Sequence, residues 1–116
     1  MSFTVVHQLN KRLYDNVSIS ANSSSDAVNI DSFSLYAIQH KWTGATGTWS
    51  IIIEGTNEQL NPADSDYTTI DVTNVTTSSG NRLVNVEKAG YSLVRVRISY
   101  SSGGGTLKST INAKVL

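Results

Sequence analysis

The 116 residues suffice for a single domain, and nine basic and nine acidic residues give a formal net charge of zero, without the basic excess typical of nucleic-acid-binding proteins. The absence of cysteine excludes a disulfide framework and a cysteine-based zinc site. The balanced charge leads us to expect no nucleic acid as partner. No apolar run reaches the roughly 20 residues of a membrane helix, so we also expect no membrane as partner.

Residues 1–20 are rich in apolar side chains and are expected to form an N-terminal strand or arm, followed by a β-sandwich core domain over residues 21–116. Two interpretations stay open: a strand that completes the sandwich, or an arm that docks on a neighbouring subunit. In the second case the interface residues are Phe3, Val5, Val6, Leu9, Leu13 and Tyr14. The segment lacks the basic start and long apolar stretch of a secretory signal, so we expect the chain to be made in a cytoplasm and to leave it, if at all, by lysis or an unusual route.

Residues 33–42 form the first long predicted strand, after a polar loop at residues 22–26. One apolar face of this strand consists of Tyr36, Ile38, His40 and Trp42, and the other consists of Phe33, Leu35 and Ala37. Because both faces are apolar, the strand is expected to be buried on both sides or to meet a neighbouring subunit. A Gly-Thr segment at residues 43–48 then predicts a hairpin, since glycine supplies the positive φ of a tight turn.

A further strand begins at Trp49 and alternates through Ile51 and Ile53, and residues 57–66, with the only proline, are expected to form a loop. The clearest alternation lies in residues 91–100, where Val94, Val96, Ile98 and Tyr100 share one face. Arg95 and Arg97 share the other face and are interpreted as a small basic stripe on a solvated sheet surface. After a glycine-rich turn at residues 103–105, the last strand alternates from Leu107 to Val115.

An internal repeat is the most specific signal in the sequence. Residues 42–49 match residues 100–107 at an offset of 58, with Gly47-Thr48 over Gly105-Thr106. With a two-residue adjustment the match extends upstream to residues 28–30 over residues 84–86, while residues 1–20 lie outside both copies. Each half therefore predicts strands around a Gly-Thr hairpin, and two such halves packed face to face would form a pseudo-symmetric sandwich.

Residues capable of chemistry are few and scattered. His40 lies on an apolar strand face, where a packed, hydrogen-bonded histidine is favoured over a metal ligand, and His7 has no carboxylate set nearby. Asp64-Ser65-Asp66 lacks the spacing of a calcium loop and is expected to be a solvated turn. No Gly-x-Ser-x-Gly motif or phosphate-binding loop occurs. We therefore expect no catalytic residue, no metal, no cofactor and no enzymatic activity.

Trp42 and Trp49 flank the first predicted hairpin and leave two interpretations open. Core packing is favoured, and a sugar-stacking platform is the alternative.

Two stretches of the chain carry a resemblance to a known family. Residues 36–58, with Trp42-Thr43-Gly44 leading through Gly47-Thr48 into a second strand, and residues 91–107, with a closing hairpin pattern, resemble small phage virion structural proteins. The resemblance covers about residues 27–116, although Thr56-Asn57-Glu58 lacks the usual Asp-Gly turn. The same region faintly resembles discoidin-like modules, which keeps glycan binding open.

The residues predict an all-β, antiparallel β-sandwich, jelly-roll-like or pseudo-symmetric from two duplicated hairpin units. The resemblance implies a phage virion accessory protein, either a capsid decoration or cementing subunit or a small tail or fibre component. Its partners would be copies of itself and other virion proteins, held by protein–protein adhesion. The alternative function is a carbohydrate-binding β-sandwich module with a host surface glycan as ligand.

Overall fold

The computed structural model describes residues 8–87 and 90–115 and confirms the predicted all-β, antiparallel fold. Its strands are β1 (Gln8–Ser18), β2 (Ser23–Ser24), β3 (Val28–Asn29), β4 (Leu35–Thr56), β5 (Thr68–Asn74), β6 (Gly80–Glu87) and β7 (Leu93–Lys114). A short 3₁₀ helix, η1 (Asp64–Asp66), lies in the loop before β5. Within these described residues every strand pair is antiparallel, and no helix is long and apolar enough to cross a membrane.

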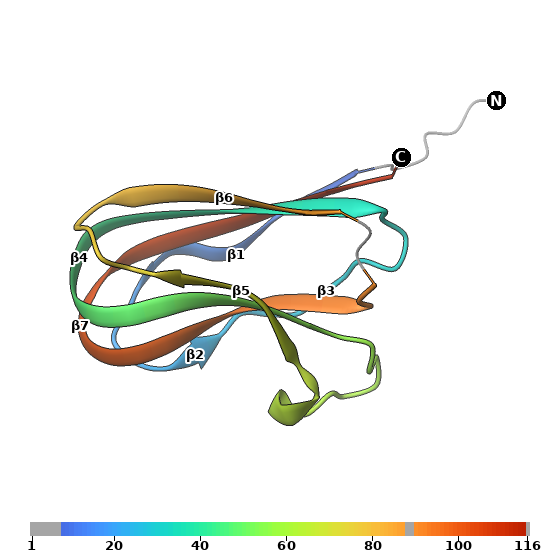
Figure 1. Ribbon diagram of the computed structural model, residues 1–116, viewed down its shortest axis with the longest axis horizontal. Helices are drawn as coiled ribbons and strands as arrows, with labels where there is room; N and C mark the ends of the chain where they lie inside the picture. The colour runs from blue at the N-terminus through green and yellow to red at the C-terminus, as the bar shows by residue number, and fades with distance from the viewer. Residues whose placement is uncertain (1–7, 88–89, 116) are drawn as a thin grey trace.

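Two long strands shape the molecule, because β4 and β7 each contain 22 residues and pair with each other along nearly their whole length. Strands of globular proteins usually have about 3–10 residues, and both of these fold over at their midpoints, as Figure 1 shows. The predicted Gly-Thr hairpins at residues 43–48 and 103–106 are therefore wrong. These segments fold a continuous pair of strands from one layer back into the other (Figure 1), but the two arms of each strand do not pair with each other as in a hairpin.

The glycines of the bend explain why hairpin chemistry occurs there. Gly47 and Gly103 have φ of 71° and 82° and are register partners. A Cβ atom on Gly47 would lie 2.4 Å from the carbonyl oxygen of Ser102, so only glycine allows the two backbones to approach this closely. Register shifts between Thr43 and Thr46, and between Thr48 and Trp49, increase the local bend.

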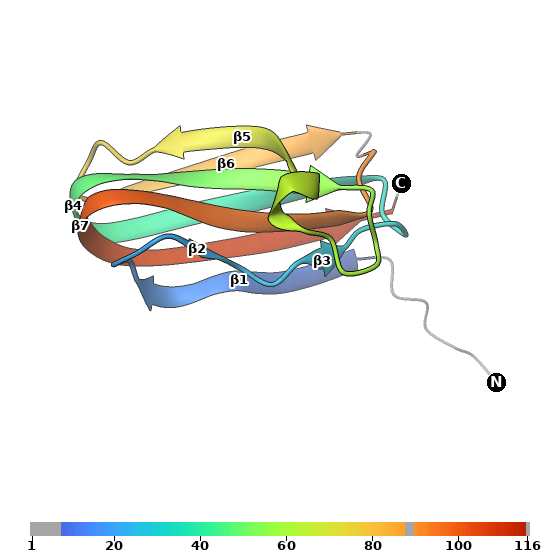
Figure 2. The ribbon, with the colours of Figure 1, turned by 90° about the horizontal axis from the view of Figure 1, so that it is seen from below.

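The bend divides the sheet into two packed layers, which Figure 2 shows from a second side. Layer one consists of β1, β6, residues 35–43 of β4 and residues 106–114 of β7. Layer two consists of β2, β3, β5, residues 49–56 of β4 and residues 93–100 of β7. The loop of residues 57–67, with η1, lies outside layer two (Figure 1).

The strand pairs of the structure follow the repeat predicted from the sequence and extend it to more residues. Trp42 pairs with Leu107 and Trp49 pairs with Tyr100, so an offset of 58 exchanges the two pairs. Val28 pairs with Val94 and Val86 pairs with Tyr36, which requires the same offset without the two-residue adjustment. β1 lies beside β7 where β5 lies beside β4, so residues 8–18 have a counterpart in the second copy. The expectation that this segment lies outside both copies is wrong.

The core lies between the layers and consists of the inward faces of both long strands. The fully buried apolar residues there include Ile38, Ile51, Ile53, Val94, Val96, Ile98, Leu107 and Ile111. Burying a side chain of this size stabilises a fold by about 1.5–3 kcal/mol, so the alternation read from the sequence accounts for much of the driving force.

Candidate functional site

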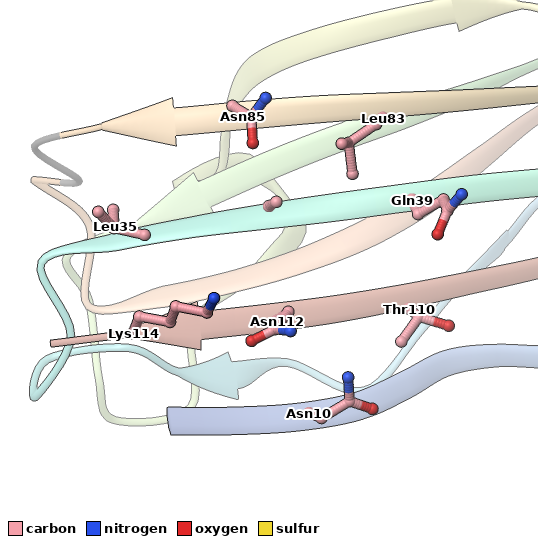
Figure 3. Close-up of a pocket in the computed structure, with 9 residues that line it drawn as sticks. Asn10, Leu35, Gln39, Leu83, Asn85, Thr110, Asn112 and Lys114 are labelled. Carbon is pink, nitrogen blue, oxygen red and sulfur yellow. The ribbon is translucent and has the colours of Figure 1, made fainter. Parts of the chain in front are cut away.

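The outer face of layer one carries a groove of about 320 Å³. Figure 3 shows its lining side chains, which come from β1, β4, β6 and β7: Asn10, Leu35, Ala37, Gln39, Leu83, Asn85, Thr110, Asn112 and Lys114. The alternation of β4 places Leu35, Ala37 and Gln39 on this face, opposite the buried row of Tyr36, Ile38 and His40.

The centre of the groove is a row of asparagines around a small residue. Asn10 pairs with Asn112, Asn112 pairs with Ala37, and Ala37 pairs with Asn85. Register partners project from the same side of a sheet, so the methyl group of Ala37 forms a low floor between amide side chains. The side-chain oxygen of Asn112 is buried and accepts no hydrogen bond within the described residues. This lining offers hydrogen-bond donors and acceptors and suits binding.

Leu35 and Ala37 of the second apolar face predicted for residues 33–42 lie on this outer face, whereas Phe33 precedes β4 and packs against the core. Leu35 and Ala37 are half-buried and Gln39 is exposed, and Leu83 on β6 beside them is 57% exposed. The described part of the chain therefore leaves this face uncovered. Of the two sequence expectations, burial on both sides is wrong, while contact with a neighbouring subunit stays a prediction.

A buried ionic cluster lies under the loop of residues 57–67 on layer two. The Arg95 Nε donates to Glu54 Oε1 at 2.6 Å, its Nη2 donates to Asp64 Oδ1 at 3.0 Å, and its guanidinium lies 3.8 Å from the ring centre of Tyr67. Burial alone would lower the pKa of Arg95, but the hydrogen bonds to Glu54 and Asp64 outweigh it and raise that pKa above its ordinary value. The cluster attaches the loop to the sheet.

The expectation of a solvated basic stripe is therefore wrong for Arg95, which is only 9% exposed. Arg97 is half-buried and donates to the second Glu54 oxygen at 3.2 Å. The alternation of the strand correctly places both arginines on the outer side of layer two. Arg95 is buried there because the loop of residues 57–67 covers it.

His40 is a packed core residue, as predicted. Its side chain is fully buried, and its Nδ1 lies 2.7 Å from the hydroxyl oxygen of Ser109. Burial lowers the pKa of His40 to about 4, and the charge of Asp71 only partly opposes that effect. Burial likewise raises the pKa of Tyr36, whose hydroxyl has no hydrogen-bond partner among the described residues.

The two tryptophans are core residues, with exposures of 7% for Trp42 and 2% for Trp49. Their ring nitrogens donate to the carbonyl oxygens of Thr77 and Gly104. Favoured core packing is confirmed, and the alternative of a sugar-stacking platform is wrong because neither ring face is accessible.

The residues proposed as an N-terminal interface occupy different environments. Phe3, Val5 and Val6, like His7, lie outside the described residues. Leu9 and Leu13 are half-buried against the core, and Tyr14 is 5% exposed with its hydroxyl 2.9 Å from that of Ser23. Tyr14 is therefore a core residue whose side chain is not available at the described surface.

The acidic turn Asp64-Ser65-Asp66 uses both carboxylates within the protein. Asp64 accepts from Arg95, and Asp66 Oδ2 accepts from the Ala63 backbone N–H at 2.7 Å. The turn is thus part of the loop attachment. Among residues 8–87 and 90–115, no group of three or more histidine and acidic side chains is placed to hold a metal ion.

Two solved structures share this fold across the whole chain. The crystal structure of the SPBc2 prophage-derived protein YomS matches with a TM-score of 0.56 and 13% identity, covering 96% of this chain and 99% of that one. A structure of Bacillus endospore appendages, which form a family of disulfide-linked pili, matches with a TM-score of 0.53 and 15% identity, covering 100% of both chains.

The fold thus defines a class of small antiparallel β proteins that includes a prophage protein and a pilus subunit, and identities this low show the shared fold alone. No known protein family matches the sequence, and no curated protein matches it.

Proposed function

We propose that this protein is a structural subunit of a phage particle, acting by adhesion to copies of itself and to other particle proteins and not by catalysis. The observation that carries the proposal is the fold match over the full length of a prophage-derived protein and of a pilus subunit.

The uncovered face of layer one supports adhesion. Leu35, Ala37 and Leu83 place apolar surface beside the central row of amide side chains, and such a mixture of apolar and hydrogen-bonding groups is typical of protein interfaces. Each such contact is modest, and repeated copies on a particle convert modest contacts into strong attachment through avidity. The sequence holds no cysteine, so disulfide bonds would not join copies of this chain, unlike the disulfide-linked pili.

Mass spectrometry of purified phage particles tests this proposal. Particles from the cells that encode the chain are expected to contain it in many copies, at a constant ratio to the major capsid or tail protein. A preparation in which the protein stays with the cell lysate and is absent from banded particles would contradict the proposal.

Immunogold electron microscopy of the same particles separates the two locations. Label spread over the head supports a decoration or cementing subunit, and label confined to the tail supports a tail or fibre component. Unlabelled particles would contradict both.

A further inference from the structure

Charged side chains are sorted between the two outer faces, although the whole chain is neutral. The charged residues of layer one are mostly basic: Lys11, Arg12, Lys41, Arg82, Lys108 and Lys114. Arg12 pairs with Asp15 of β1 at 2.6 Å and Arg82 pairs with Asp71 of layer two, and Glu87 of β6 is the other acidic residue of this layer. The structure thus leaves a surplus of positive charge on the face that also carries the groove.

Two of these lysines lie directly opposite each other. Lys41 on β4 and Lys108 on β7 are register partners, and Asn81 on β6 is the next partner of Lys41. Within the described residues, no ion pair joins either lysine to an acidic side chain. Like charges at directly opposite positions destabilise a sheet, so this pair is explained by an external acidic group more readily than by folding.

The layer-two side carries the complementary charge. Arg95 and Arg97 are the basic residues described there, and Glu54 and Asp64 offset them through the ionic cluster. Asp71 of β5 is half-buried and pairs with Arg82, and the other acidic side chains on this side are exposed: Asp26, Asp31, Glu58 and Asp66. These exposed residues lie on the loop outside layer two or in the segment of residues 25–34 beside it.

We propose that a second copy of this chain docks its acidic layer-two side on the basic outer face of layer one. This inference rests on the proposed structural function and names the partner of that face. Four strands about 4.8 Å apart and about nine residues long give a face of roughly 600 Å², close to the roughly 800 Å² per partner of a standard interface. Because the two surfaces differ and lie on opposite sides, repetition of the contact builds an open chain of subunits.

A charge-exchange experiment on the full chain tests this arrangement. The basic-face variant carries Lys41→Glu and Lys108→Glu, and the acidic-side variant carries Asp26→Lys and Glu58→Lys. The carboxylates of Asp26 and Glu58 make no hydrogen bond or ion pair within the described residues, so these changes leave the fold intact. A control carries Ser20→Glu and Thr76→Glu, on exposed loop residues between the layers.

Sedimentation velocity at about 50 mM salt is expected to show wild-type and control proteins associating with rising concentration, and about tenfold weaker association at about 500 mM salt. Each charge variant alone is expected to stay monomeric. An equimolar mixture of the two variants is expected to associate again, because each then meets a complementary surface. A general folding defect cannot produce that rescue.

Wild-type protein that stays monomeric at every concentration, or variants that associate as wild type does, would overturn the docking arrangement. A mixture that fails to associate while wild type does would overturn it as well. If the protein is nonetheless found in purified particles, the structural function stands and only the self-docking is wrong. Absence from particles contradicts the function whatever the association result.

Discussion

At the scale of single residues, His40 makes stability depend on pH. Its folded pKa is about 4, while the ordinary value is 6.5, so the unfolded chain binds a proton first as the pH falls. The stabilisation from neutral His40 is complete above pH 6.5 and is lost progressively as the pH falls to 4. Since a tenfold change in proton affinity is worth about 1.4 kcal/mol, the loss is about 3 kcal/mol.

Urea unfolding at neutral pH and near the folded pKa measures this loss. A His40→Gln variant is expected to show a smaller drop in the free energy of unfolding than wild type, and a His7→Gln control removes the other histidine of the sequence. Equal drops in wild type and His40→Gln would show that another group dominates.

Glu54 gives a second prediction at this scale, because one carboxylate serves both Arg95 and Arg97. Its side chain is 5% exposed, and removing one partner of a buried ion pair costs about 3–5 kcal/mol. We expect Glu54→Gln to lower the free energy of unfolding by about 3 kcal/mol and to loosen the loop of residues 57–67. Limited proteolysis, with cleavage mapped by mass spectrometry, checks the loop. An Asp15→Asn control removes only an exposed carboxylate.

At the scale of elements, the bend of β4 and β7 depends on close backbone contact. A methyl group on Gly47 would overlap the Ser102 carbonyl, whereas Gly44, also with positive φ, has nothing within 4 Å of its Cβ position. We expect Gly44→Ala to cost about 1 kcal/mol, from left-handed backbone strain alone. Gly47→Ala is expected to cost several kcal/mol more, because the paired backbones must separate. Equal unfolding free energies for the two variants would show that the bend tolerates separation.

The open edge between β5 and β6 is closed by one arginine. Arg82 on β6 forms two bonds of 3.0 Å to the Asp71 carboxylate on β5 and a third, of 2.6 Å, to the Thr73 hydroxyl. Arg82 is 43% exposed, so solvent screening limits the contribution to about 1 kcal/mol. We expect Arg82→Met to lower stability by this amount, and Arg82→Lys to restore little of it because lysine cannot form the two-bond contact. Thermal unfolding of both variants measures the difference.

At the scale of the whole molecule, the alternation of apolar and polar residues correctly predicted which side chains face the core. The glycine-rich segments, in contrast, led to hairpins that the structure does not contain. Val94, Val96 and Ile98 are inward as expected because period two is a property of the strand itself. The hairpins failed because the strand on each side of a bend pairs with the other long strand, so the partner of Gly47 is Gly103, far along the chain. The sequence supplies no register between such distant strands.

The groove could not be predicted for the same reason. Outward positions of β4 follow from its pattern, but the hollow needs Ala37 aligned with Asn112 and Asn85, and these come from different strands. The burial of Arg95 likewise depends on where the loop of residues 57–67 crosses the sheet. The 58-residue offset read from the sequence would have supplied part of this if it had been extended to residues 8–18, since it relates β1 to β5.

Cutting the chain into its two repeat copies tests whether each copy needs the other in order to fold. Chains of residues 1–58 and 59–116, cut within the exposed loop, are each expected to lack stable structure alone, because β4 and β7 supply each other's principal partner. Mixed together, they are expected to regain the β-rich circular dichroism spectrum. A stable monomeric half would show that one copy buries its own core.

Thr46 pairs with Gly104, which is its own counterpart 58 residues later, so a two-fold axis passes through this pair. The molecule thus has the geometry of an isologous dimer of half-length chains whose ends have been joined. The two outer faces of such a dimer would be identical. The segment that joins the two copies, residues 57–67, lies over the outer face of layer two only (Figure 1), so the two outer faces of the molecule differ and the molecule has a direction.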